Sequence, residues 1–315
     1  MLKEIYSDCL IGIEIEFQGP VLIRSGQPAL EDPDMRFVRT FRNGRFEIYI
    51  PGSSFKGMLR AHAERITRTL AENYGIPVVK SACDPFSEDK SCSKKLEKFA
   101  KERNLKKIDG VTAYKESCLI CKLFGSTSMA GRLKVEDCYL NPSLQDIRPE
   151  IKDGVGIDRF TGGVASGPFQ LEVVPSAKLK SVLHIRNFEL WQFGCLAYVF
   201  KDLEEGLIRI GAGKSRGLGK ISGTVQSVTL SYVGTQYPTP PSIWGIRKFF
   251  QDNSYGFFDQ ENSDINVSCS FQAEDQNYGL RKAFYFKDKE QIEALWQAVA
   301  PLFNSKVKEL SHEEG

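Results

Sequence analysis

Four of the eight cysteines are spaced for a metal site. Cys83, Cys92, Cys118 and Cys121 follow the pattern C-x8-C-x25-C-x2-C. The C-x2-C pair is typical of one half of a structural zinc site, and four thiolates complete a tetrahedron around Zn²⁺. A redox-active C-x-x-C pair is the alternative, although nothing in the sequence indicates a thioredoxin-like fold. We therefore expect a structural zinc ion held by these four cysteines.

The segment around these cysteines is rich in lysine. Between Lys90 and Lys107 it carries eight basic and two acidic residues. Such a stretch is too polar to fold alone, so a bound metal ion would stabilise its folded form. We interpret residues 80–122 as an insertion. The other cysteines lie in apolar or strand-like stretches and are expected in the core; they are Cys9, Cys138, Cys195 and Cys269.

A second chemical feature is the glycine-rich segment 210–219, Ile-Gly-Ala-Gly-Lys-Ser-Arg-Gly-Leu-Gly. Glycines let the backbone approach a ligand closely, and cationic side chains can hold phosphates. A Walker A loop would need glycine where Ile208 stands, and a dinucleotide fingerprint would need glycine at Arg216. A basic loop that leads into a strand suits an RNA backbone better, and an ordinary flexible hairpin is the alternative. The expected RNA contacts are Gly211, Gly213, Lys214 and Arg216.

A third feature is the helix start at 51–60, Pro-Gly-Ser-Ser-Phe-Lys-Gly-Met-Leu-Arg. Ser53 or Ser54 can cap the free amides of the first turn. These amides and the positive end of the helix dipole, beside Lys56 and Arg60, favour a phosphate. We count these four residues as candidate RNA contacts. The alternative is an amphipathic helix whose basic residues face water.

Composition limits the class of protein. Lys and Arg number 42 and Asp and Glu 40, which gives a net charge of +2, and 41% of residues are hydrophobic. The chain can therefore bury a core, and any nucleic-acid contact must come from local patches. No apolar run approaches about 18 residues, so we expect no membrane span. The N-terminus has no apolar signal-peptide core, so we expect a cytoplasmic location.

The hydrophobic periodicity predicts the elements that carry these features. Strands are expected at 10–17, 46–50, 131–140, near 179–187 and at 220–232, and helices from the 51–54 turn to about 73 and at 189–204. This order of strand, helix, strand, strand, helix, strand matches a ferredoxin-like (RRM-like) α+β domain. Residues 19–45 read as a long loop, with a short strand at about 36–41.

The proline-rich stretch 236–242 indicates a boundary between a domain at 1–232 and a C-terminal extension at 233–315. The extension is expected to hold a helix around 288–309, interrupted by Pro301. Its function is not indicated by the sequence.

Several motifs together resemble one family. The segment 50–60, Leu123-Phe-Gly125 and Gly131-Arg-Leu133 resemble the RAMP superfamily (repeat-associated mysterious proteins). Asp158-Arg-Phe-Thr-Gly162 and Glu172-Val-Val-Pro175 resemble the backbone subunit of type III CRISPR effector complexes, in a variety that carries a zinc finger. The glycine-rich loop is the usual last feature of that superfamily. The resemblance covers about residues 8–232.

This resemblance implies a ferredoxin-like palm with an inserted thumb hairpin at about 150–176. Such subunits of antiviral ribonucleoproteins stack along a guide CRISPR RNA beside other effector subunits, and their thumbs splay the duplex with single-stranded target RNA. Arg159 and Thr161 of the thumb would contact RNA backbone. Phe160 and Phe169 would wedge between bases or stack on them.

The resemblance also implies cleavage of the target RNA at a loop aspartate. Asp34 matches the family's position best, and Asp32 is the neighbouring alternative. Scission by a 2′-hydroxyl needs in-line geometry, proton removal and stabilisation of charge at phosphate. A carboxylate can act as the base or hold a divalent cation, for which magnesium or manganese is expected.

Two other functions stay open. The subunit can be a non-catalytic RNA-binding scaffold of the same complex, with its acidic residues in a solvated turn. It can also be a guide-RNA-processing endoribonuclease, an enzyme class that often relies on histidine. The three histidines are His62, His184 and His312, and none lies in the loop 19–45.

Overall fold

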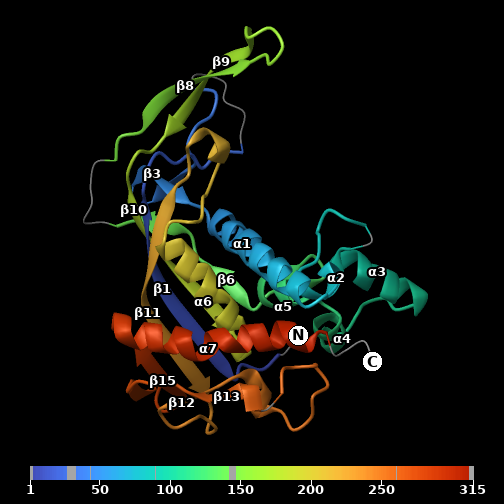
Figure 1. Cartoon of the computed structure of the whole chain (residues 1–315). Helices are drawn as coiled ribbons and strands as arrows, with labels where there is room; N and C mark the ends of the chain where they lie inside the picture. Colours follow the sequence, from blue (N-terminus) through green and yellow to red (C-terminus); the bar gives the residue numbers. More distant parts are fainter. Residues whose placement is uncertain are drawn as a thin grey trace.

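One antiparallel sheet contains strands from both the N-terminal and the C-terminal parts of the chain (Figure 1). The computed structural model describes residues 3–26, 33–42, 44–88, 90–141, 147–259 and 261–311. The strands of the main sheet lie in the order β14-β15-β11-β1-β10-β7-β3-β2, and β6 also pairs with β10. Their bounds are β1 (Ser7–Phe17), β2 (Arg39–Arg42), β3 (Arg45–Ile50), β6 (Leu133–Val135), β7 (Cys138–Leu140), β10 (Lys178–Arg186), β11 (Ile221–Val233), β14 (Gln272–Gln276) and β15 (Arg281–Phe286). The mixed α+β class expected from the sequence is confirmed.

Three long helices cover one face of this sheet: α1 (Gly52–Asn73), α6 (Leu190–Glu204) and α7 (Lys289–Glu309) (Figure 1). Along β1, Ile11, Ile13 and Ile15 alternate with more exposed residues, because successive side chains of a strand point to opposite faces. The buried face of β1 therefore meets the helices. The elements β1, α1, β6, β10, α6 and β11 follow the order that the sequence predicts, and their strands lie in the order β11-β1-β10-β6.

The C-terminal segment, from residue 233 onwards, packs into the same hydrophobic core as the residues before it. β15 pairs with β11, and α7 packs against α6. Gly194 of α6 permits this approach, because a Cβ there would lie 2.4 Å from the carbonyl oxygen of Val299. The interruption expected at Pro301 is wrong, since α7 continues to Glu309. Buried neighbours such as Phe303 outweigh the lost backbone hydrogen bond.

The start of α1 also differs from its expected form. Pro51 occupies the cap position, and neither Ser53 nor Ser54 caps the helix. Instead Oδ1 of Asp137 accepts a hydrogen bond of 2.7 Å from the backbone N–H of Gly52. Asp137 reaches this position because the strand expected at 131–140 is broken between β6 and β7. Gly52 is needed there, as a Cβ would lie 2.4 Å from the Val135 carbonyl oxygen.

Two parts project from the sheet. The thumb hairpin, formed by β8 (Glu150–Ile157) and β9 (Val164–Val173), rises at the top of Figure 1. The insertion lies at the right of that view, beside α1. Its helices are α2 (Val78–Ser81), α3 (Cys92–Glu102), α4 (Gly110–Lys115) and α5 (Leu119–Phe124). Two short strand pairs lie outside the main sheet. They are β4 (Gly125–Ser126) with β5 (Met129–Ala130), and β12 (Ser242–Trp244) with β13 (Asp264–Asn266).

Candidate metal centre and nucleic-acid interface

The four predicted cysteine ligands converge on one point. The sulfurs of Cys83, Cys92, Cys118 and Cys121 all lie within 4.8 Å of one another, and all four residues are buried. The Sγ atoms of Cys83 and Cys121 are 3.5 Å apart. Zn–S bonds of about 2.3 Å in a tetrahedron require sulfurs about 3.8 Å apart, so this group fits a zinc ion.

The surroundings of the cluster favour thiolates. The backbone N–H groups of Cys83 and Cys121 donate to Cys118 Sγ, and that of Cys118 donates to Cys92 Sγ at 3.2 Å. Contacts with the other thiols lower the pKa of Cys83 and of Cys92, whereas mutual contacts and burial raise the pKa of Cys118 and of Cys121, so the case for a cation rests on the convergence of the sulfurs and on the backbone donors. Because metal ligation needs deprotonated sulfur, these contacts prepare the site for a cation.

The remaining cysteines divide between the core and its surface. Cys9, Cys138 and Cys195 are buried, whereas Cys269 is half-buried. Burial raises the pKa of Cys138 and of Cys195 to about 12, so both thiols stay protonated near neutral pH.

Arg60, expected to contact RNA, lies against the metal centre. Its guanidinium donates to Cys121 Sγ at 3.6 Å, to the Gly125 carbonyl at 2.9 Å and to Glu64 at 2.9 Å. Four thiolates around a Zn²⁺ ion would carry two net negative charges, and Arg60 would offset part of that charge. The structure thus gives Arg60 a role in tying α1 to the insertion.

The other expected contacts in α1 line a groove. Ser53, Lys56 and Arg60 line it from α1, and the insertion and the segment before β6 supply the other walls. The Lys56 ammonium donates to the Leu133 carbonyl at 2.8 Å. Burial, with the nearby charges of Arg60 and Lys134, lowers the pKa of Lys56. Ser54, in the same helical turn, is not among the residues that line this groove.

The glycine-rich loop is shaped by close backbone packing. Gly211 has a φ of +79°, and a Cβ there would lie 2.1 Å from the Leu22 carbonyl oxygen. The same carbonyl accepts a hydrogen bond from the backbone N–H of Ala212. Gly213, with a φ of +71°, precedes the short helix η1 (Lys214–Arg216). The fold therefore holds this loop against the segment after β1 and leaves Lys214 and Arg216 exposed.

The base of the thumb brings two predicted features together. The Arg216 guanidinium lies 5.1 Å from the ring centroid of Phe169 in β9. Oδ2 of Asp34 accepts a hydrogen bond of 2.7 Å from the backbone N–H of Gln170, the next residue. The glycine-rich loop and the candidate catalytic carboxylate thus contact adjacent residues of one strand. Asp32 lies outside the described residues.

The segment after Asp34 is clamped to β9. The Glu172 carboxylate accepts a hydrogen bond of 2.8 Å from the Phe37 backbone N–H and binds the Arg39 guanidinium. Burial opposes ionisation of Glu172, but the bonds from Arg39 and Phe37 outweigh it and lower the pKa of this carboxyl. This ion pair fixes the position of Asp34 relative to the thumb.

The remaining thumb residues stand apart, at the hairpin tip. Arg159 and Thr161 are exposed, and Phe160 is completely exposed. Asp158 organises the turn by accepting hydrogen bonds from the backbone N–H of Phe160 and Thr161 and from the Thr161 hydroxyl. The structure does not bring the tip to the base of the thumb.

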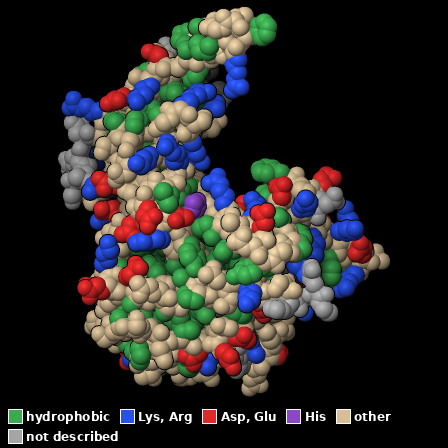
Figure 2. All heavy atoms as spheres, viewed as in Figure 1, with side chains coloured by type: hydrophobic (Ala, Val, Ile, Leu, Met, Phe, Trp, Pro, Cys, Tyr) green, Lys and Arg blue, Asp and Glu red, His purple; other side chains and the backbone are tan. Residues whose placement is uncertain are grey.

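Figure 2 shows a hollow between the thumb and the body that carries the insertion. Lys and Arg side chains gather along its inner wall, although the net charge of the whole chain is small. A concave surface lined with cations is suited to a polyanion.

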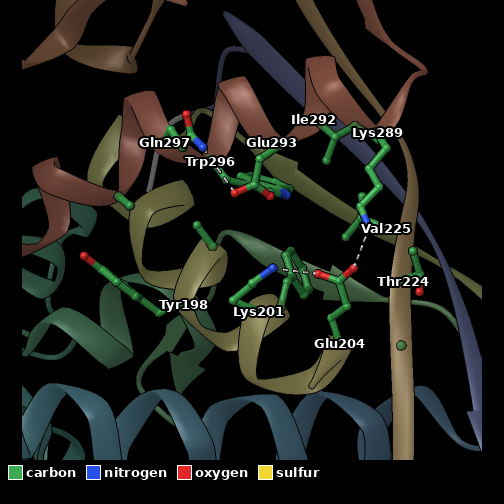
Figure 3. A pocket seen from close by; sticks show the side chains of 14 residues that line it. Tyr198, Lys201, Glu204, Thr224, Val225, Lys289, Ile292, Glu293, Trp296 and Gln297 are labelled. Carbon is green, nitrogen blue, oxygen red and sulfur yellow. Dashed lines mark hydrogen bonds and ion pairs between the residues drawn. The ribbon is translucent and has the colours of Figure 1, made fainter. Parts of the chain in front are cut away.

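A separate pocket of about 220 Å³ lies between α6, α7 and β11 (Figure 3). Its walls are largely apolar, with Phe200, Trp296 and Val225 among them. The Glu204 carboxylate at its rim pairs with Lys201 at 3.2 Å and Lys289 at 3.3 Å. None of the predicted site residues lines it, so we do not connect it with RNA.

Sequence reasoning missed some of these partners. The Arg39–Glu172 pair joins residues 133 positions apart, so no local pattern linked the two residues. Lys134 lines the groove and lowers the pKa of Lys56, yet its only sequence signal is its place beside the Gly131-Arg-Leu133 motif.

Much of the chain matches a known protein family. A family model described as the RAMP superfamily matches residues 14–222. A search of the curated proteins found no match. No helix among the described residues is long and apolar enough to span a membrane.

Proposed function

The chain belongs to the RAMP superfamily, and we propose that it is a backbone subunit of a type III CRISPR ribonucleoprotein. Membership supports a CRISPR-associated subunit that binds RNA. In our proposal the guide RNA follows the glycine-rich loop and the start of α1, on a ferredoxin-like palm. The thumb then meets the duplex between guide and target RNA. The partners are the guide, the target strand and neighbouring effector subunits.

One observation carries this proposal. Lys214 and Arg216 stand exposed on a backbone that close packing holds in shape, beside the base of the thumb. Guanidinium and ammonium groups on a rigid loop can bind successive phosphates at little entropic cost. A guanidinium that contacts a ring through its face would keep its edge available to a phosphate.

RNA binding is tested on the purified chain with a single-stranded RNA. Each lost phosphate contact should lower the slope of log Kobs against log salt by about 0.7. We expect this change for Lys214→Ala and for Arg216→Ala. Lys308→Ala, which removes an exposed cation from α7, is the matched control and should leave the slope unchanged. Unaltered slopes for both loop variants would contradict the proposal.

We further propose that Asp34 promotes cleavage of the target RNA. The carboxylate is exposed and held by Gln170 at the thumb base, and among the described residues no donor contacts its second oxygen, which can take a proton or bind magnesium or manganese. A divalent cation would supply charge stabilisation at the phosphate. In the assembled complex, Asp34→Asn should slow cleavage at this subunit's position by about 10²–10⁴-fold.

The matched control is Asp252→Asn, since Asp252 is an exposed carboxylate in the C-terminal segment. Full cleavage by the Asp34→Asn complex, with normal RNA binding, would favour the non-catalytic scaffold and make Asp32 the next residue to substitute.

A further inference from the structure

Two phenylalanine rings stand in solvent on the hairpin of β2 and β3. Phe41 is 64% exposed and Phe46 is 73% exposed. They face each other across the two strands, with ring centroids 5.2 Å apart and planes at 68°. Rings this exposed add little to the core. Folding alone therefore does not account for two adjacent aromatic side chains at this edge of the sheet.

The same hairpin is strongly basic. Its two strands contain one acidic residue, Glu47, and three basic residues, Arg39, Arg42 and Arg45. Arg39 is bound to Glu172, and Arg42 pairs with Glu47 at 3.3 Å. The Arg45 side chain is exposed and forms no hydrogen bond or ion pair within the described ranges. Arg45 lies opposite Arg42 in the register and so projects from the face away from the two rings, where its charge is available to an anionic ligand at the edge of the hairpin.

The opposite face of the hairpin carries a second aromatic group. The Arg42 guanidinium lies 4.1 Å from the ring centroid of Tyr139, and that ring stacks on Tyr49 with centroids 6.0 Å apart. These contacts hold the hairpin against β7 and leave the rings of Phe41 and Phe46 on the other face. The exposed pair therefore stands on a rigid support.

The hairpin begins beside the candidate cleavage site. Arg39, the first residue of β2, is bound to Glu172, and Asp34 is bound to Gln170, two residues earlier in β9. A strand of RNA that passes Asp34 therefore comes close to the hairpin.

We propose that the face formed by Phe41 and Phe46 is a stacking platform for unpaired bases of an RNA strand that passes Asp34. The inference rests on the proposed function and adds to it a site for single-stranded bases outside the thumb. Aromatic rings stack on any base, while guanidinium groups hold the adjacent phosphates. The excess of arginine favours this ligand over a protein surface, which the experiment includes as an outcome.

The platform is tested by fluorescence of 2-aminopurine, placed in turn at each position of a single-stranded RNA bound to the full chain. Stacking quenches this base, so wild type should quench at one or two positions. Phe41→Ala and Phe46→Ala should each abolish that quenching and weaken binding about tenfold. Their salt slopes should equal that of wild type, because no charge is lost, whereas Arg45→Ala should lower the slope by about 0.7.

Two further variants separate stacking from folding. Phe41→Tyr and Phe46→Tyr keep a ring and should restore both quenching and affinity. Tyr278→Ala removes a fully exposed ring from the turn between β14 and β15 and should change neither.

Unchanged quenching in both alanine variants, with Lys214→Ala still defective, would overturn this inference and leave the proposed function standing. A wild-type chain that binds no RNA would overturn both. If the alanine variants bind RNA normally but lose self-association or a protein partner in sedimentation, the face is a protein interface and the inference is wrong.

Discussion

The Arg216 guanidinium lies over the ring of Phe169, 5.1 Å from its centroid. This contact joins the glycine-rich loop to the thumb, two segments that no local pattern links. The contact restricts the motion of the guanidinium, which lowers the entropic cost of binding a phosphate.

The first prediction concerns this contact. Phe169→Ala should weaken RNA binding by about threefold to tenfold, since a cation–π contact contributes about 0.5–1 kcal/mol at an exposed site and the freed arginine loses order. The salt slope should stay at the wild-type value because Arg216 keeps its charge. Titration of the purified chain with RNA at several salt concentrations measures both quantities. A fall in slope would show that Phe169 acts through the charge, contrary to our account.

The second prediction concerns metal. Purified protein should contain about one zinc ion per chain, and Cys92→Ser should reduce this content and destabilise the insertion. Removal of zinc with a chelator should expose the segment 80–122 to proteolysis before the rest of the chain. Cys269→Ser is the matched control, because Cys269 is distant in sequence from the cluster and half-buried. A metal-free protein with a protease-resistant insertion would contradict the four-cysteine site.

The third prediction concerns the cap of α1. Asp137→Ala should lower the free energy of unfolding by about 1 kcal/mol, as for other lost helix caps. Ser53→Ala and Ser54→Ala should each change it by less than about 0.5 kcal/mol, since neither side chain caps the helix. Chemical denaturation of the three variants distinguishes the two arrangements. A larger loss in either serine variant would favour the cap expected from the sequence.

The fourth prediction concerns pH. Burial opposes ionisation of Asp8, but hydrogen bonds from Arg281 and His184 outweigh it and lower the pKa of its carboxyl. A carboxyl whose folded pKa is lowered stabilises the protein above its unfolded pKa of about 3.9, and this contribution disappears as the pH falls through the folded value. Asp8→Asn should therefore cost about 2 kcal/mol at pH 7.

The difference between wild type and Asp8→Asn in free energy of unfolding should stay constant from pH 7 to pH 5 and narrow below about pH 4. Urea denaturation across this range measures it, with Asp252→Asn as the control. Because Arg281 belongs to β15, the result also tests whether the C-terminal extension depends on this ion pair. A difference that widens on acidification would refute the assignment.

Several features followed from the sequence alone because they depend on local spacing. The alternation in β1, the helical period of α1 and the four-cysteine pattern are properties of residues near one another in the chain, and the structure contains all three. The motifs also sufficed for the superfamily, which the family match confirms.

The arrangement of the site was decided by tertiary structure. Asp34 and Gln170 are 136 residues apart, and Gly52 and Asp137 are 85 apart, so no periodicity connects either pair. The same holds for Arg60. The sequence indicated a contact with RNA, but in the fold the Arg60 guanidinium donates to Cys121 Sγ. Short-range periodicity determines which face of an element is buried, but the register of the sheet and the packing of the insertion determine which side chains meet.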